Sequence, residues 1–422
     1  MQFQVRFHDR LCGVLSIEDE RMQFAYDAAY LAGGGPALSV AMPLRAQPWP
    51  DAQVFPFFEN LLPEGLLREL LASELGTASN NFERLLAATG GDVAGALSLE
   101  LTPQTPGATH EPGAGDALSD VALGEVVERI KSHPFLVQNP QGMRLSLAGA
   151  QNKLPIILDA QGIVRLPGTL PSTHILKPPS ERFTALVENE TLCMRAAARA
   201  GLRVPRTWLV PFRTAADTLQ HGYVVQRYDR LALPDGSTQR LHQEDTCQIL
   251  GIPSARKYTQ DGGPGFGEVF RVLRQFTVPA AVQQQELVRR MIFNLLIGNQ
   301  DAHGKNVSLL HAGGQVVLSP AYDLVCTDVY DGLSERFAMP IGKAWHWREL
   351  NDAALDDFLA DTGVALRRQA SVLRRFIDKA TEAVALEAAA LQQEALPGSH
   401  ATLSQIVRIT QRHAIQLKAW LS

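Results

Sequence analysis

One ten-residue stretch organises the chain: Ile297-Gly298-Asn299-Gln300-Asp301-Ala302-His303-Gly304-Lys305-Asn306. A mostly apolar run, residues 291–297, leads into it, and a second, residues 307–310, follows it. A polar cluster enclosed by core-forming sequence is costly unless its groups find partners. A metal ion and a phosphate would be suitable partners, so the rest of the chain is searched for groups that bind them.

The composition is that of a globular protein. The 422 residues are 45% hydrophobic and 20% charged, which excludes a disordered chain. This length allows two or three domains with a sizeable core. The net charge of -5 argues against a free-standing nucleic-acid binder, but it leaves open binding through a basic partner.

No targeting or membrane segment is visible in the sequence. Residues 1–10 lack an apolar signal-peptide core, and no apolar run approaches the roughly 18 residues of a membrane span. The four cysteines, at positions 12, 193, 247 and 326, are far apart and form no Cys-x-x-Cys pair, which disfavours a zinc site or a disulfide scaffold. We expect a soluble, cytoplasmic protein with reduced thiols and no membrane partner.

The order of predicted elements indicates an α+β fold with four segments. Residues 1–102 form an N-terminal β/α subdomain, in which strands fill the first 45 residues and Phe55–Gly65 opens a helix. Residues 103–116 are a Pro/Gly-rich linker, longer than most loops within a domain. Residues 117–232 contain a small sheet with one inserted helix, and residues 233–422 are mostly helical.

Four features that phosphoryl transfer requires follow one another along the chain. A small-residue loop follows Ser146, and Lys177 ends a predicted strand. Asp301 and Asn306 then lie five positions apart, and Asp323 follows a short strand pair. In kinases a loop covers the phosphates, a lysine pairs with them, a carboxylate orients the attacking hydroxyl, and Asn and Asp hold Mg²⁺. The D-x-x-x-x-N spacing also matches the kinase catalytic loop.

Each feature alone has an ordinary structural explanation. A D-x-x-x-x-N match arises by chance, a lysine at the end of a strand is usually solvated, and Asp323 could cap a helix. The ordered combination, with its polar block set in apolar sequence, favours a site.

Several sequence blocks also carry a family resemblance. They lie at residues 57–63 (FFENLLP), 146–153 (SLAGAQNK), 174–177 (HILK), 243–248 (QEDTCQ), 257–265 (KYTQDGGPG) and 301–306 (DAHGKN). In these blocks, and over nearly the whole chain, the sequence resembles the HipA family, the serine/threonine kinase toxins of bacterial type II toxin–antitoxin pairs. The resemblance implies a two-lobed protein-kinase-like fold with an extra N-terminal subdomain, a helical C-terminal lobe, and the use of ATP and Mg²⁺.

The resemblance implies a role for each residue of the site. Asp301 is expected to be the catalytic base and Lys177 the phosphate-pairing lysine, with Asn306 and Asp323 as Mg²⁺ ligands. The expected ATP contacts are Ala148, Gly149, Ala150, Gln151 and Asn152 of the phosphate loop, Gln226, Arg227 and Tyr228 of the hinge, and Lys177, His303, Lys305, Asn306, Tyr322 and Asp323.

The resemblance also implies regulation and partners. Ser146 matches the serine that family members autophosphorylate, a modification that displaces the phosphate loop. A phosphoserine carries about -1.5 to -2 charges, which would repel a nucleotide triphosphate. The expected partners are a small DNA-binding antitoxin of HipB type, with DNA contacted only through it, and a cytoplasmic protein substrate such as glutamyl-tRNA synthetase, phosphorylated to arrest growth.

Some positions depart from the eukaryotic kinase pattern or stay open. Asn299-Gln300 replaces His-Arg, Leu324-Val325 replaces Phe-Gly after the metal Asp, and there is no G-x-G-x-x-G. Either Glu188 or Glu190 could pair with Lys177, with a slight preference for Glu190.

Two positions in the central block also have alternatives. His303 is expected to shape the loop rather than to bind a transition metal, because no second His stands at metal spacing. Lys305 could contact γ-phosphate or be a solvated loop charge. Residues 261–267 favour a surface turn near the protein substrate over a phosphate cradle.

Two other functions are compatible with these residues. The first is a co-repressor that binds the antitoxin without catalysis of its own. The second is a small-molecule phosphotransferase with similar active-site residues.

Overall fold

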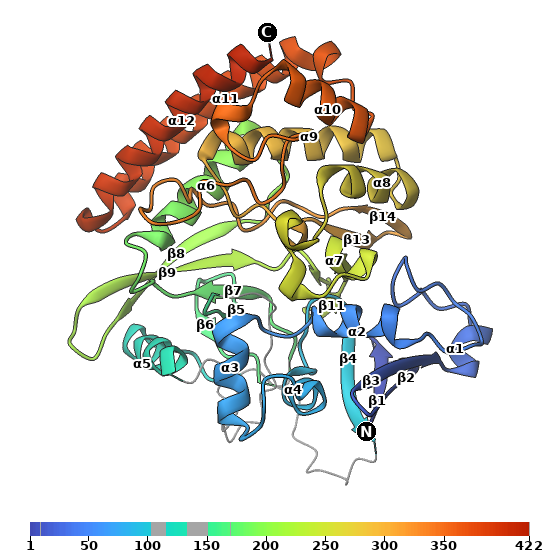
Figure 1. The fold of residues 1–422 in the computed structure, drawn as a ribbon. Coiled ribbons are helices and arrows are strands. Elements are labelled where there is room, and N and C mark those ends of the chain that lie inside the picture. Colours follow the sequence, from blue (N-terminus) through green and yellow to red (C-terminus); the bar gives the residue numbers. More distant parts are fainter. Residues whose placement is uncertain (9, 103–114, 133–150, 169, 422) are drawn as a thin grey trace.

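The computed structural model describes residues 1–8, 10–102, 115–132, 151–168 and 170–421, and it has the predicted α+β fold (Figure 1). Its buried apolar side chains form three clusters: one in the N-terminal part, one on the β5–β9 sheet and one in the helical part. Most of the predicted linker, residues 103–114, lies outside the described residues. Within them, no helix is both long and apolar enough to cross a membrane.

The N-terminal part contains an antiparallel sheet in the order β3-β2-β1-β4. Its strands are β1 (Gln2–Phe7), β2 (Arg10–Glu18), β3 (Arg21–Tyr26) and β4 (Leu97–Thr102). In β1, Phe3, Val5 and Phe7 are buried, whereas Gln4 and Arg6 are partly exposed. This alternation places the apolar side chains on one face, as the sequence predicted.

Four helices cover this sheet and lead to the rest of the molecule. They are α1 (Ala28–Ala32), α2 (Asp51–Glu59), α3 (Gly65–Glu74) and α4 (Phe82–Thr89). The predicted helix opening at 55–65 was wrong in one respect, because residues 55–59 already belong to α2, although Pro56 lies inside that helix. Burial of Val54, Phe57 and Phe58 in the core compensates for the hydrogen bond that Pro56 cannot make.

The second part is a five-stranded antiparallel sheet in the order β6-β5-β7-β9-β8. Its elements are α5 (Asp120–Ser132), β5 (Leu154–Leu158), β6 (Val164–Arg165), β7 (His174–Lys177), α6 (Leu186–Ala200), β8 (Thr207–Arg213) and β9 (Leu219–Gln226). Val224 packs in the cluster with α5, and its neighbours Tyr223 and Val225 pack with α6. The two helices therefore cover opposite faces of the sheet (Figure 1).

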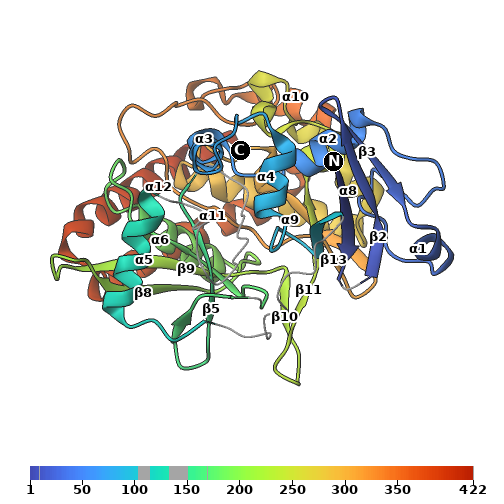
Figure 2. The same cartoon turned by 90° about the horizontal axis from the view of Figure 1, so that it is seen from below.

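The third part is mostly helical, as predicted, but it also holds a three-stranded sheet, β12-β13-β14, that was only partly expected. Its elements are β10 (Arg230–Ala232), β11 (Thr238–Arg240), β12 (His242–Asp245), α7 (Thr246–Leu250), α8 (Phe266–Phe276), α9 (Ala280–Ile297), β13 (Ser308–Ala312), β14 (Gln315–Leu318), α10 (Asp352–Thr362), α11 (Leu366–Glu394) and α12 (His400–Trp420). Short 3₁₀ turns lie at Ser254–Arg256, Thr259–Asp261, Gly304–Asn306, Trp347–Glu349 and Pro397–Ser399. Seen from below (Figure 2), the N-terminal sheet and the β5–β9 sheet lie on opposite sides of the molecule.

A buried ionic cluster joins the N-terminal part to the segment after β9. Arg227 pairs with Asp229 at 2.9 Å and with Asp92 of the N-terminal part at 3.5 Å. Arg230 contacts the same two carboxylates, at 2.7 Å from Asp92 and 2.9 Å from Asp229. All four side chains are at least 93% buried, so the charges compensate one another away from water.

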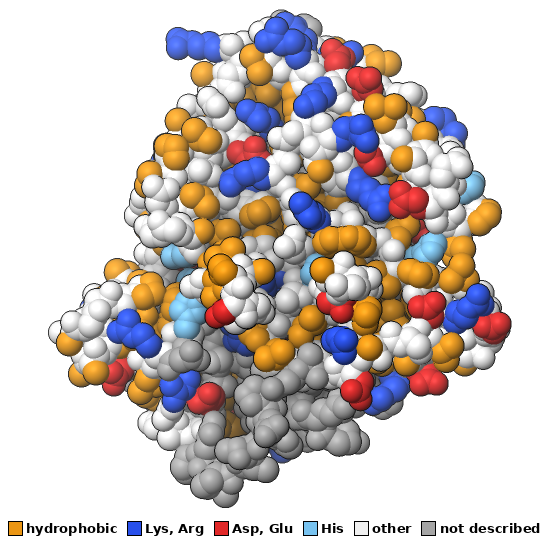
Figure 3. All heavy atoms as spheres, turned by 180° about the vertical axis from the view of Figure 1, so that it is seen from behind, with side chains coloured by type: hydrophobic (Ala, Val, Ile, Leu, Met, Phe, Trp, Pro, Cys, Tyr) orange, Lys and Arg blue, Asp and Glu red, His pale blue; other side chains and the backbone are white. Residues whose placement is uncertain are grey.

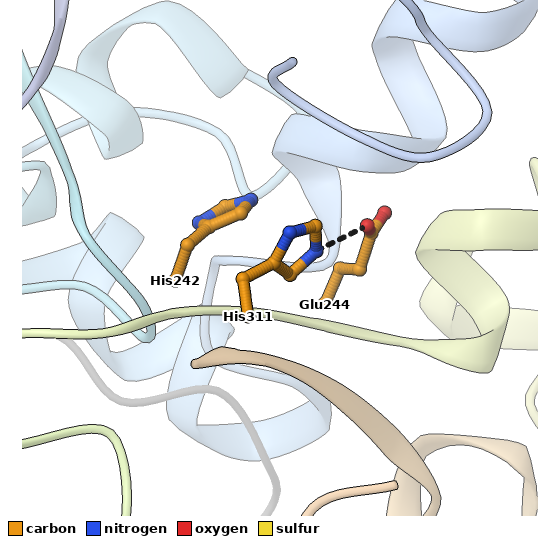
Figure 4. A group of neighbouring side chains, drawn as sticks. All are labelled: His242, Glu244 and His311. Atoms are coloured by element: carbon orange, nitrogen blue, oxygen red, sulfur yellow. Dashed lines mark hydrogen bonds and ion pairs between the residues drawn. The ribbon is translucent and has the colours of Figure 1, made fainter. Parts of the chain in front are cut away.

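A second junction involves His242 and Glu244 of β12 and His311 of β13 (Figure 4). These residues are of the types that bind Zn²⁺, yet hydrogen bonds already explain the cluster. The Glu244 carboxylate accepts bonds from the Ser39 hydroxyl at 2.5 Å, the Val40 N–H at 3.0 Å and His311 Nε2 at 3.1 Å. His242 Nε2 lies 2.9 Å from the Leu38 carbonyl oxygen, and burial lowers the pKa of His242 to about 4, so this ring is neutral and donates. The cluster therefore fastens residues 38–40 to the β12–β13 pair.

Candidate active site

A large cleft, with a volume of about 1060 Å³, opens where the three parts meet. It brings together residues that are far apart in the sequence. The predicted site residues that line it are Gln151, Asn152, Lys177, Gln226, Arg227, Tyr228, Asp301, His303, Lys305, Asn306, Tyr322 and Asp323. The predicted residues Ser146, Ala148, Gly149 and Ala150 lie outside the described residues.

Lys177, the last residue of β7, lies between two carboxylates. Its Nζ is 2.6 Å from Glu190 Oε1 and 2.6 Å from Asp323 Oδ1. The partner on α6 is therefore Glu190 and not Glu188. Burial alone would lower the pKa of Lys177, but the two carboxylates raise it above its usual value. Lys177 therefore stays cationic, and two of its three N–H donors are engaged.

The catalytic block begins where α9 ends. Gly298 adopts a left-handed conformation with φ +69°, and a Cβ there would lie 2.7 Å from Asp328 Oδ2. The chain then folds on itself: the Asp301 N–H donates to Asn299 Oδ1, and the His303 N–H donates to the Asp301 carbonyl. Much of the polar island is thus satisfied by its own members, which leaves the Asp301 carboxylate exposed in the cleft.

Asn306 and Asp323 meet across the cleft floor. Asn306 Nδ2 donates to Asp323 Oδ2 at 3.5 Å, and Asn306 Oδ1 accepts from the His303 N–H at 3.1 Å. Asp323 has φ +53°, a conformation that Asp tolerates better than most residues do. Burial would raise the pKa of Asp323, but Lys177 and Lys153 lower it to about 2, so it is a carboxylate at neutral pH. A carboxylate and an amide oxygen fit a hard cation such as Mg²⁺.

Lys305 is buried, so the alternative of a solvated loop charge is wrong. Its Nζ donates to Asn60 Oδ1 at 2.7 Å and to the Asn60 carbonyl at 3.0 Å, and it lies 3.1 Å from Glu64 Oε1. The catalytic block is therefore anchored to the N-terminal part. A phosphate contact by Lys305 stays a prediction.

His303 is buried with a pKa lowered to about 4, chiefly by burial, so it is neutral. Its ring meets the Tyr258 ring edge-on, with centroids 5.1 Å apart. These contacts are those of a residue that shapes the loop.

The hinge segment contributes an aromatic surface and a structural arginine. The rings of Tyr228 and Tyr322 are stacked, with centroids 5.5 Å apart and an interplanar angle of 28°. The Gln226 N–H donates to the Arg206 carbonyl and the Arg227 N–H to the Thr173 carbonyl, so an adenine would need other backbone groups. The Arg227 guanidinium belongs to the ionic cluster with Asp92, which gives it a structural role in addition to any nucleotide contact.

Two cleft residues were quoted in the sequence blocks without an assigned role. Tyr258 donates its hydroxyl hydrogen to Asp301 Oδ1 at 2.7 Å. Lys153 also lines the cleft, where the charges of Asp323, Lys177, Glu64 and Glu190 act on it. The signal for Lys153 was its place at the end of the small-residue loop, because a cation there can follow the loop onto phosphates.

Lys153 leads to a testable pH dependence. Burial and the nearby Lys177 lower the pKa of Lys153 to about 8, against the attraction of Asp323. Lys153 is therefore charged below pH 8 and loses its charge above it. We expect the Kd of the wild type for Mg-ATP, measured by calorimetry, to rise about tenfold between pH 7 and pH 9.5, as one phosphate contact is lost. In Lys153→Met the Kd should be raised at pH 7 and nearly constant over this range. An equal pH dependence in both proteins would contradict the role of Lys153.

Comparisons with known proteins agree with this geometry. Residues 3–100 match the HipA N-terminal domain, and residues 145–388 match the HipA-like C-terminal domain. The serine/threonine-protein kinase toxin HipA of Shewanella oneidensis is 30% identical over 406 residues, which are 91% of this chain and 89% of that protein. The Sinorhizobium fredii protein Y4mE, a kinase by name only, is 38% identical over 369 residues, 86% of each chain.

A solved structure shows the same fold. It is the complex of HipA, HipB and operator DNA from Shewanella oneidensis, whose matching chain has a TM-score of 0.80 and 26% identity. The match covers 99% of this chain and 96% of that chain. The fold is therefore the two-lobed, kinase-like fold of that protein, and the chain belongs to the HipA family, whose relatives named here are kinases.

Proposed function

We propose that this protein is a Mg-ATP-dependent serine/threonine protein kinase that acts as the toxin of a toxin–antitoxin pair. One observation carries the proposal. Lys177 is held between Glu190 and Asp323, with Asn306 beside Asp323, in the cleft that also exposes Asp301. A lysine–glutamate pair, a metal-binding Asp and Asn, and a free carboxylate are the groups that kinase chemistry combines.

Each residue has a defined task in this proposal. Lys177 pairs with the phosphates of ATP through its ammonium group, and Glu190 holds that group in place. Mg²⁺ bound by Asn306 and Asp323 would neutralise charge on the phosphate oxygens. Asp301 orients the acceptor hydroxyl and accepts its proton as the hydroxyl oxygen bonds to the γ-phosphorus and the bond to ADP breaks.

The substrate and partners are proposed from the family. We expect a cytoplasmic protein substrate, with an aminoacyl-tRNA synthetase such as glutamyl-tRNA synthetase as the first to test. The HipA relative whose structure matches was solved with HipB and operator DNA, which supports a HipB-type antitoxin as partner here. On the face shown in Figure 3, Lys and Arg side chains are interspersed with Asp and Glu. That pattern and the net charge of -5 favour DNA contact through the antitoxin.

Phosphate transfer gives the direct test. Wild-type protein incubated with Mg-ATP should gain one phosphate by intact mass and should label proteins of a cell lysate from γ-labelled ATP. Ser146→Ala should gain no phosphate itself, yet it should label the lysate proteins at least as strongly, because it lacks the inhibitory modification.

The controls separate the alternatives. Asp323→Asn should label nothing, because it lacks a metal ligand. Label in small hydroxylated compounds but in no protein would indicate a small-molecule phosphotransferase. Unchanged protein labelling by Asp323→Asn would overturn the assignment of the site.

A further inference from the structure

Tyr258 makes a direct contact with the proposed catalytic base. Its hydroxyl donates to Asp301 Oδ1 at 2.7 Å. The backbone of Asp301 is fixed by Asn299 and His303, but within the described residues Tyr258 makes the one hydrogen bond to the carboxylate itself. The orientation of that carboxylate therefore depends on Tyr258.

Tyr258 is itself held in place by its surroundings. Its carbonyl accepts hydrogen bonds from the N–H groups of Asp261 at 3.0 Å and Gly263 at 2.9 Å. Gly263 is required in this turn, because a Cβ there would lie 2.2 Å from the Arg256 carbonyl oxygen. The neighbouring Lys257 Nζ donates to Glu64 Oε2 at 2.7 Å, which ties the segment to the N-terminal part.

The protonation of Tyr258 fits a donor and not a base. Burial, and then the charge of Asp301, raise the pKa of Tyr258 above its usual value. The phenol therefore keeps its proton at physiological pH. A phenol that keeps its proton can fix the carboxylate but cannot take the proton of the acceptor hydroxyl.

From this geometry we infer that Tyr258 is a positioning residue for phosphoryl transfer. Its hydroxyl occupies Asp301 Oδ1 and thereby turns Oδ2 toward the acceptor hydroxyl of the protein substrate. The proton of that hydroxyl passes to Oδ2, the acceptor oxygen bonds to the γ-phosphorus, and ADP leaves. The inference rests on the proposed kinase function, and no contact to ATP is assigned to Tyr258.

The test is the variant Tyr258→Phe, which removes one oxygen and keeps the ring against His303. We expect the maximal rate of γ-phosphate transfer to lysate protein to fall about 10- to 100-fold, because a loosened base is misplaced by fractions of an ångström. The KM for Mg-ATP should stay within about twofold of the wild type. The thermal unfolding midpoint should be unchanged, which excludes a folding defect.

The matched control is Tyr330→Phe. Tyr330 lines the same cleft, but its hydroxyl accepts a hydrogen bond from Asn189 Nδ2 at 3.2 Å, away from Asp301. This variant should keep the wild-type transfer rate. A double variant, Tyr258→Phe with Asp301→Asn, should be no slower than Asp301→Asn alone, since Tyr258 acts through Asp301.

The outcomes distinguish two failures. A wild type that transfers no phosphate from Mg-ATP would overturn the proposed function itself. An active wild type with an equally fast or faster Tyr258→Phe would overturn the positioning role; a faster variant would show that the phenol instead blocks the place of the acceptor hydroxyl. A double variant that loses activity multiplicatively would also contradict action through Asp301.

Discussion

Replacing Asp301 with Asn should lower the maximal rate of phosphate transfer by about 10²- to 10⁴-fold, the usual contribution of a general base. The amide keeps the size of the side chain and can still accept the Tyr258 hydrogen bond, but it cannot take a proton. Asp301 is exposed, so the free energy of unfolding should change little. The Kd for Mg-ATP should stay within about twofold, because Lys177, Asn306 and Asp323 are untouched.

The measurement combines initial rates of γ-phosphate transfer with calorimetric titration of Mg-ATP. Asp331→Asn is the matched control, because Asp331 is an exposed aspartate that lines no part of the cleft. It should retain wild-type rates. Weakened Mg-ATP binding in Asp301→Asn, with the transfer rate at saturation unaltered, would show that Asp301 binds nucleotide instead of activating the hydroxyl.

Replacing Arg227 with Met should be the most destabilising single change considered. It leaves Asp92 and Asp229 buried beside a single remaining arginine, Arg230, at full contact distance. Breaking such a buried pair costs about 3–5 kcal/mol, much more than the loss of a surface ion pair. Urea unfolding should show this loss, and protease should release the N-terminal part at lower denaturant than in the wild type.

The same cluster predicts a dependence on acid. Although burial alone would raise them, Arg227 and Arg230 lower the pKa values of Asp92 and Asp229. Groups with lowered pKa values contribute stability above their unfolded pKa, near 4, and that stability is lost as the pH falls further. The difference between wild type and Arg227→Met should therefore be full at pH 7 and shrink below about pH 4. Arg367→Met, which breaks an exposed pair with Asp356, should change neither quantity measurably.

Some of this site could be predicted because its chemistry is written locally. The five-residue interval from Asp301 to Asn306, and the order in which Lys177 and Asp323 flank it, are visible in the sequence. The choice between Glu188 and Glu190 was not, because both lie in the first turns of α6 and only packing decides which faces Lys177.

The remaining features depend on contacts between distant segments. Asn60 and Glu64 hold Lys305, yet nothing in either segment indicates the other. The bond from Tyr258 to Asp301 spans 43 residues and depends on a tight turn at Gly263. Helix α2 was misplaced because the local preference of Pro56 opposes a helix, whereas burial of its neighbours in the core favours one.

The anchoring of Lys305 has a consequence for the time at which activity can appear during synthesis. Asn60 and Lys305 are separated by 245 residues. At about 5–20 residues per second, a ribosome needs roughly 12–50 s to travel between them. Throughout that interval Asn60 and Glu64 lack the ammonium group that they hold in the finished protein, and Asp301 and Asn306 are not yet made. A nascent chain is therefore inert until most of its length has emerged, which gives a partner encoded beside it time to be translated as well.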